Sequence, residues 1–221
     1  MRHLAQPAVL KAAAVAAAVT TLASYLRLSF WMHRALPIWY LEIMIFLCSM
    51  VLWGFVFAWH TPYTGRPLWN FKPDLRLFLA VTLLAIGAAT LCHRFSDPLL
   101  RPRFPEEFPT DFKHWLAIVL FAMFLNRLFL LFAPFAWLMR LLKNQWAAAI
   151  LTVLFGTFVL LLRIQSLPTP VPATFLVIEF TSRIIGGFLA VWFYLRGGIL
   201  LIWWWTLLFQ ARQLWDLTGQ A

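Results

Sequence analysis

Long apolar runs, each separated from the next by a short polar connection, dominate this sequence of 221 residues. A helix needs about 20 consecutive apolar residues to cross the hydrocarbon core of a bilayer, and it satisfies its own backbone hydrogen bonds there without water. The runs therefore predict an all-α fold, a polytopic transmembrane helix bundle with about seven spans. The predicted spans cover residues 8–26, 37–59, 75–92, 112–139, 145–164, 173–195 and 199–215.

The composition excludes a soluble protein. Charged residues make up 12% of the chain and hydrophobic residues 63%, whereas soluble domains carry roughly twice that charged fraction, about 25%. So few charges cannot cover the surface of a water-soluble domain. Residues 1–221 are therefore interpreted as a single integral membrane domain, multi-pass, with the lipid bilayer as its first partner.

The formal net charge of +10 indicates contact with lipid phosphates rather than with nucleic acid. The basic residues stand singly near the ends of the apolar runs, where Lys and Arg reach the headgroups. With seven spans, eight Lys and Arg residues fall on each side of the membrane. The positive-inside rule consequently gives a tie, and the orientation stays open.

Three local features qualify this arrangement of spans. Residues 1–24 have the charge and the small residues of a signal peptide, but a retained first helix is preferred because no soluble domain follows. Pro134 is expected to kink or end the fourth helix, leaving residues 135–142 as an interfacial amphipathic turn. The Pro-rich segments 60–74 and 93–111 are predicted to be solvated loops.

Four polar residues fall deep inside the spans, where an unpaired ionisable group costs several kcal/mol and marks a candidate functional site. Glu42 and Gln210 also lie within spans, but close enough to an end for ordinary interfacial contacts. The deep residues are predicted to form one polar cluster that joins the fourth and sixth helices. That cluster consists of Asn126, Arg127, Glu179 and Arg183.

Glu179 and Arg183 permit two interpretations. Their i, i+4 spacing places both on one helix face in the favoured order. As catalytic candidates, Glu179 would act as base or ligand and Arg183 would orient it. As structural residues they would form an ion pair, or Glu179 would bridge to Arg127. The structural interpretation is preferred, because no histidine, second acid or serine nucleophile accompanies Glu179.

No metal site and no cofactor are predicted. The five histidines fall at span ends or in loops, and zinc needs three or four converging ligands. The candidate metal site in a loop consists of His114 with Glu106, Glu107 and Asp111. For these side chains, contact with water at the membrane interface is the preferred interpretation.

Two Gly pairs and a Trp block indicate how the last helices pack. Residues 186–187 permit the sixth helix to approach a neighbour closely, and residues 197–198 are expected to form a tight turn between the last two spans. The block IWWWTL at 202–207 is expected to present at least one Trp to lipid or to a membrane-protein partner.

Residues 120–216 resemble the CAAX protease and bacteriocin-processing (CPBP, or Abi) family of intramembrane peptidases. The resemblance rests on NRLFLLFAPFAWLMRLLKNQWAAAILTVLFGTFV and on IIGGFLAVWFYLRGGILLIWWWTLLFQARQLWDL. It implies a CPBP-like C-terminal core and a location in the bacterial inner (cytoplasmic) membrane.

The catalytic motifs of that family are degenerate here. The resemblance implies metal-binding or water-activating residues in EExxxR, FxxxH and HxxxN or HxxxD motifs, but no catalytic residue carries over. Arg127 would also repel a cation at a site that needs paired carboxylates. The positions that correspond to the motifs are Asn126 and Arg127, Phe155 and Val159, and Leu207 and Ala211.

The expected function is therefore that of a catalytically inactive, CPBP-like binding or accessory subunit of a membrane complex. One alternative is a diverged CPBP-type intramembrane metallopeptidase that uses Glu179, Arg183 and a loop histidine such as His114. A second is a small transporter in which Arg127, Glu179 and Arg183 line a polar path.

Overall fold

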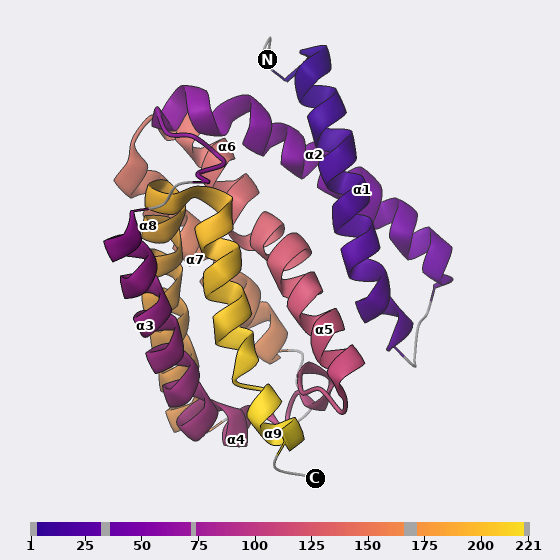
Figure 1. The fold of residues 1–221 in the computed structure, drawn as a ribbon, viewed down its shortest axis with the longest axis vertical. Coiled ribbons are helices and arrows are strands. Elements are labelled where there is room, and N and C mark those ends of the chain that lie inside the picture. The colour runs from indigo at the N-terminus through magenta and orange to yellow at the C-terminus, as the bar shows by residue number, and fades with distance from the viewer. Residues whose placement is uncertain (1–3, 32–35, 72–73, 166–171, 219–221) are drawn as a thin grey trace.

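The computed structural model describes residues 4–31, 36–71, 74–165 and 172–218. Within those ranges every regular element is a helix, and six helical stretches are long and apolar enough to cross a membrane. Most of them pack side by side as a bundle, and the stretch Ile38–Thr64, labelled α2, runs across it at a steep angle (Figure 1). The predicted all-α transmembrane bundle is confirmed, and the chain is a multi-pass membrane protein.

The first helices follow the predicted spans closely. α1 and α2 pack against each other, and α3 runs on through a π-helical turn, η1, into the short helix α4. Their bounds are Pro7–Ser29 for α1, Ile38–Thr64 for α2, Leu75–Leu91 for α3, Cys92–Ser96 for η1 and Asp97–Leu100 for α4.

The remaining elements build the rest of the bundle. η2 is a single 3-10 turn, η3 and η4 are π-helical, and α9 is a short helix after the last long one. Their bounds are Pro105–Glu107 for η2, Phe112–Phe121 for α5, Ala122–Asn126 for η3, Leu128–Phe132 for η4, Ala133–Leu142 for α6, Gln145–Gln165 for α7, Ala173–Ala211 for α8 and Leu214–Thr218 for α9.

The longest helix, α8, is two helices joined by a reversal at Gly198, which has φ 67° and ψ −163°. In Figure 1 the chain rises through the first part of α8 and descends through the second. Phe193 and Trp205 contact each other across the reversal, with ring centroids 5.1 Å apart and ring planes tilted by 51°. The predicted turn at residues 197–198 is therefore present, and the two parts of α8 correspond to the sixth and seventh predicted spans.

The fourth span continues past Pro134, so of the two expected outcomes, a kink or the end of the helix, the second is wrong. The π-helical η4 directly precedes α6, and Pro134 occupies the first turn of α6. Proline has no N–H to donate to the carbonyl of residue i−4. The π-helical turn before it uses hydrogen bonds between residues five apart, so it does not need that bond. Residues 135–142 form a helix and not the predicted turn. The helix is amphipathic as predicted: Phe135, Ala136 and Met139 are buried in the core, whereas Trp137, Leu141 and Leu142 are exposed.

Both predicted loops are partly helical. Residues 93–100 extend the third helical stretch, and α2 continues to Thr64 before Gly65 ends it in the left-handed conformation. The segment that follows α2 reaches the reversal of α8, where Ile199 donates its N–H to the carbonyl of Leu68 at 3.1 Å. This connection ties the turn to the rest of the bundle.

The second part of α8 lies inside the bundle rather than at its edge. Trp205 is buried, Trp203 donates its indole N–H to the Met123 carbonyl at 2.9 Å, and Trp204 donates to Thr82 at 2.9 Å. All three residues of the Trp block therefore pack against this chain. Trp203 and Trp204 are nevertheless only partly buried, so the expectation that one of them also faces lipid or a partner stays a prediction.

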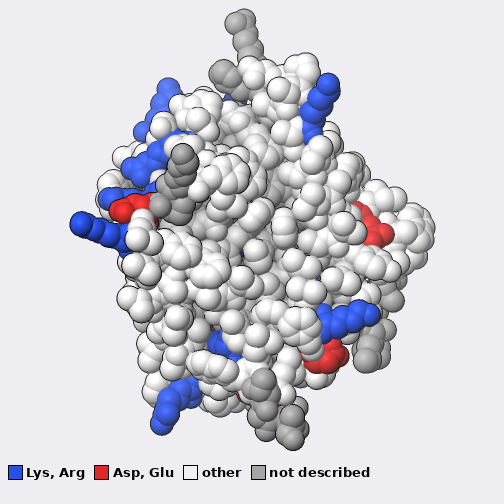
Figure 2. Space-filling view, in the orientation of Figure 1, with Lys and Arg blue, Asp and Glu red and all other residues white. Residues whose placement is uncertain are grey.

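The distribution of charged and apolar side chains on the surface is the one expected of a protein in a lipid bilayer. In Figure 2 most Lys, Arg, Asp and Glu side chains lie toward the margin of the visible face, and its broad middle is uncharged. Many large apolar side chains are exposed along the helices, among them Leu22, Leu83 and Leu154. Lipid tails are the environment in which such a surface is stable.

Candidate functional site

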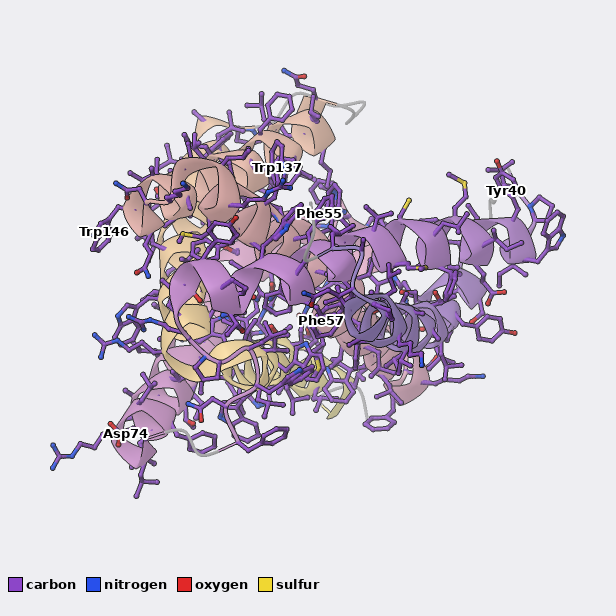
Figure 3. All side chains as sticks on the ribbon, turned by 90° about the horizontal axis from the view of Figure 1, so that it is seen from above. Tyr40, Phe55, Phe57, Asp74, Trp137 and Trp146 are labelled. Carbon is purple, nitrogen blue, oxygen red and sulfur yellow. The ribbon has the colours of Figure 1, made fainter. Side chains whose placement is uncertain are left out.

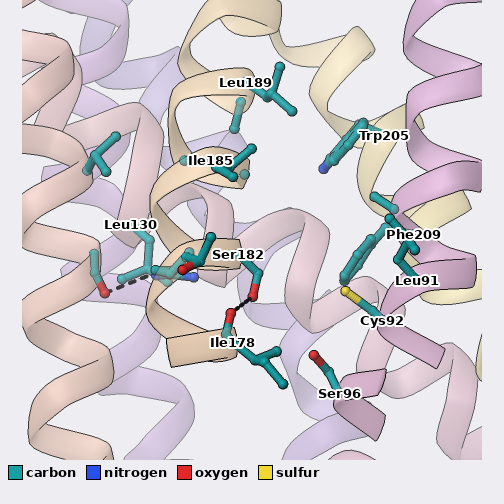
Figure 4. A pocket seen from close by; sticks show the side chains of 18 of the residues that line it. Leu91, Cys92, Ser96, Leu130, Ile178, Ser182, Ile185, Leu189, Trp205 and Phe209 are labelled. Carbon is teal, nitrogen blue, oxygen red and sulfur yellow. Dashed lines mark hydrogen bonds between the residues drawn. The ribbon is translucent and has the colours of Figure 1, made fainter. Parts of the chain in front are cut away.

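A cavity of about 700 Å³ lies between α3 with η1, the fourth helical stretch, α7 and both parts of α8. Figure 4 shows Leu91 and Cys92 approaching it from one side and Ile178, Ser182 and Ile185 from the first part of α8. Its lining is mostly apolar. The charged side chains in the lining are Arg127 and Arg183.

Arg127 lies between the two π-helical segments of the fourth stretch and is half-buried. Its Nε donates to the Thr206 hydroxyl, 2.8 Å away on the second part of α8. The guanidinium therefore joins the fourth helix to the seventh span. Its neighbour Asn126, a predicted member of the cluster, is exposed and is not part of the cavity lining.

Arg183 lies against the backbone of α7. Its Nε donates to the carbonyl of Gly156 at 3.2 Å. A Cβ on residue 156 would lie 3.0 Å from Nη2 of Arg183, so the absence of a side chain there makes room for the guanidinium. This arginine consequently joins the first part of α8 to α7.

Glu179 has a different neighbour from the one that its spacing predicts. Among the described residues no ion pair links it to Arg183, with N···O within 4.0 Å as the limit, although the two charges still attract each other. The carboxylate interacts instead with the Ser96 hydroxyl of η1. Glu179 and Arg183 share a helix face but do not form an ion pair, because Arg183 extends toward α7 and Glu179 extends toward η1.

The structure thus separates the predicted cluster into two parts. It brings Arg127 and Arg183 to one cavity, close enough for their charges to repel each other. Glu179 stays at the edge, outside the lining, and Asn126 points away.

Of the other motif positions, none lines the cavity. Phe155 packs edge-on against Phe129 with centroids 5.5 Å apart. Val159, Leu207 and Ala211 are half-buried.

His114 and its acidic neighbours are engaged with arginines and with the backbone. His114 Nε2 lies 2.7 Å from Nη1 of Arg27, while Glu106 and Glu107 pair with Arg163. Asp111 accepts the backbone N–H of His114 at 2.8 Å, and this hydrogen bond holds the pKa of Asp111 below its ordinary value. Within the described ranges no three His, Cys, Asp or Glu side chains are grouped to hold a metal ion.

An ion pair that the sequence did not indicate lies beside the cavity. Arg212 binds both carboxylate oxygens of Asp97, with Nε 3.1 Å from Oδ2 and Nη2 3.2 Å from Oδ1. Both side chains are buried. The partners are 115 residues apart, and Arg212 also donates to the side-chain oxygen of Gln210 at 3.2 Å.

The residues that line the cavity suit the binding of a ligand better than the catalysis of bond cleavage. Guanidiniums bind carboxylate or phosphate oxygens, and they are poor general bases because they stay protonated. No carboxylate or histidine lines the cavity beside them. Comparisons of the chain with protein-family models, with curated proteins and with solved structures found no match.

Proposed function

We propose that this protein acts by binding. It would be a non-catalytic accessory subunit of a complex in the bacterial cytoplasmic membrane. The observation that carries the proposal is the cavity, which presents two guanidiniums and no carboxylate. The resemblance to the CPBP family remains a prediction. It agrees with this function, because Arg127 stands where that resemblance implies a glutamate.

The helix pair α1 and α2 supports the proposal of a partner that lies within the membrane. Seen from above, α2 projects from the bundle with Tyr40 near its outer end (Figure 3). Its outer half exposes Trp39, Ile43 and Leu47. A large exposed apolar surface suits lipid and also suits the helices of a second membrane protein.

The diverged metallopeptidase has weaker support. It needs Glu179 and a histidine within reach of one water or metal. His114 contacts Arg27 and Thr110, and Glu179 interacts with Ser96.

The test combines co-purification with a peptidase assay. The protein, isolated in a mild detergent after crosslinking in the membrane, is expected to bring a membrane-protein partner in fixed ratio. It is also expected to leave peptide substrates uncut. Peptide cleavage that is lost in Glu179→Gln, but kept in the matched variant Glu42→Gln, would overturn the proposal.

A small transporter is the second candidate, favoured by the placement of Arg127 and Arg183 on one cavity. A water-filled route would expose both positions to aqueous reagents. Cysteines placed at 127 and at 183, in a chain with Cys48 and Cys92 replaced by Ser, would then react with a membrane-impermeant thiol reagent. The binding function predicts no such reaction at either position.

A further inference from the structure

We propose that the cavity binds the carboxylate of a single-chain amphiphile, such as a free fatty acid, that reaches it from the bilayer between α3 and the first part of α8. This inference rests on the proposed binding function and names its ligand.

The cavity opens toward lipid rather than toward water. Four apolar residues that line it are more than half exposed, two from the third helical stretch and two from α8. They are Leu91 at 61%, Phe95 at 56%, Val177 at 64% and Ile185 at 55%. An apolar chain therefore passes between these helices without leaving a hydrocarbon environment.

Their positions along the helices assign the two guanidiniums to the middle of the membrane. Arg183 is ten positions after Ala173, where α8 begins, which at 1.5 Å per residue is about 15 Å along the helix. That distance is half of a hydrocarbon core about 30 Å thick. Arg127 is the midpoint of the stretch Phe112–Leu142. Charges at this depth are costly and need a counter-charge.

The charges of Arg127, Arg183 and Glu179 do not cancel, and one bound anion would neutralise the remainder. Arg127 and Arg183 repel each other, and the Glu179 carboxylate attracts Arg183 from outside the lining. Two positive charges and one negative charge leave an excess of one, which a monoanion neutralises. Each guanidinium uses Nε for a neutral protein oxygen, so its terminal nitrogens remain for a carboxylate.

The lining also limits the size of the polar group. Four hydroxyl side chains line the cavity, those of Ser96, Thr152, Thr181 and Ser182. Those of Thr152 and Ser182 donate to carbonyls of their own helices. A sugar, glycerol or phosphoethanolamine headgroup would find few protein groups to replace its lost hydrogen bonds with water. A bare carboxylate needs only the two guanidiniums, and its chain needs only the apolar walls.

Photocrosslinking tests the proposal. The full-length protein in phosphatidylcholine nanodiscs is mixed with palmitate that carries a diazirine in its chain, then irradiated and mapped by mass spectrometry. Crosslinks are expected within residues 88–95 and 177–189. Excess oleate should compete, whereas oleyl alcohol, inorganic phosphate and phosphatidylglycerol should not.

Three variants sharpen the result. The double variant Arg127→Gln, Arg183→Gln should lower crosslinking at least tenfold. Arg140→Gln should leave it unchanged, since Arg140 stacks over Trp59 away from the cavity. Gly186→Leu keeps both guanidiniums and fills space that is open beside Gly186, so it should likewise lower crosslinking at least tenfold.

Crosslinks spread evenly over the lipid-facing helices, or unchanged by the two Arg replacements, would overturn the ligand assignment. Equal competition by oleyl alcohol, phosphate or phosphatidylglycerol would overturn it too. None of these outcomes would make the protein a peptidase, and Glu179-dependent peptide cleavage would overturn the binding function without moving the crosslinks.

Discussion

At the scale of single residues, the arginines show how a membrane protein holds charge at depth. Arg127 and Arg183 each have one neutral protein acceptor, Thr206 or Gly156, on a neighbouring helix. Such bonds fix the position of a guanidinium without cancelling its charge. The pair is therefore held in place for an anion, whereas Arg212, fully paired with buried Asp97, is structural.

The ion pair of Arg212 gives a direct residue-scale prediction. Asp97→Asn leaves a buried guanidinium without its counter-charge and should lower the free energy of unfolding by about 3–5 kcal/mol. Asp216→Asn, which breaks the more exposed pair with Arg101, should cost less than about 1 kcal/mol. Thermal unfolding in detergent measures both, and equal losses would show that burial does not set the difference.

Gly198 carries the second residue-scale prediction. Its φ of 67° and ψ of −163° belong to a region that is nearly restricted to glycine, and a Cβ there would lie 2.5 Å from the Leu68 oxygen. Gly198→Ala should therefore destabilise the protein by about 1–3 kcal/mol. Gly87→Ala has no atom within 4 Å of its new Cβ and serves as the control. A similar melting temperature for both variants would contradict the reversal at Gly198.

At the scale of elements, the contact of α7 with α8 depends on which glycine faces which helix. A Cβ on Gly187 would lie 3.1 Å from Cγ2 of Val153, whereas a Cβ on Gly186 would have no neighbour within 4 Å. The close approach predicted for this Gly pair is thus made by Gly187. Gly186 instead leaves space in the cavity.

Adjacent alanine substitutions separate these two roles. Gly187→Ala overpacks the helix contact and should cost about 1–3 kcal/mol of stability. Gly186→Ala should be neutral or slightly stabilising, because alanine is favoured over glycine in helices. Chemical or thermal unfolding of the two purified variants distinguishes them, and the opposite order would mean that α8 is rotated about its axis.

At the scale of the whole molecule, the reversal divides α8 into the sixth and seventh predicted spans, so the six helical stretches are expected to cross the membrane seven times. In Figure 1 α1 accordingly begins at one end of the bundle and α9 lies at the other. Reporters fused to the two termini should report opposite sides of the membrane. A reporter inserted at Gly197 should report the side of the N terminus. Both termini on one side would exclude the reversal.

The sequence predicts most of this architecture, because membrane spans follow from apolar length alone. It also locates the reversal, since paired glycines mark a turn. It does not predict the partners of the deep charges: an i, i+4 spacing places Glu179 and Arg183 on one face but does not determine which neighbour each side chain reaches. Asp97 and Arg212, 115 residues apart, leave no local pattern at all.

Native mass spectrometry tests the central claim, that the cavity with Arg127 and Arg183 is a binding site, most directly. Protein released from detergent micelles is expected to keep one bound species with the mass of a long-chain carboxylic acid. The double variant Arg127→Gln, Arg183→Gln is expected to lose it, and Arg140→Gln is expected to keep it. A wild-type protein without such an adduct, or equal occupancy in the double variant, would contradict the account.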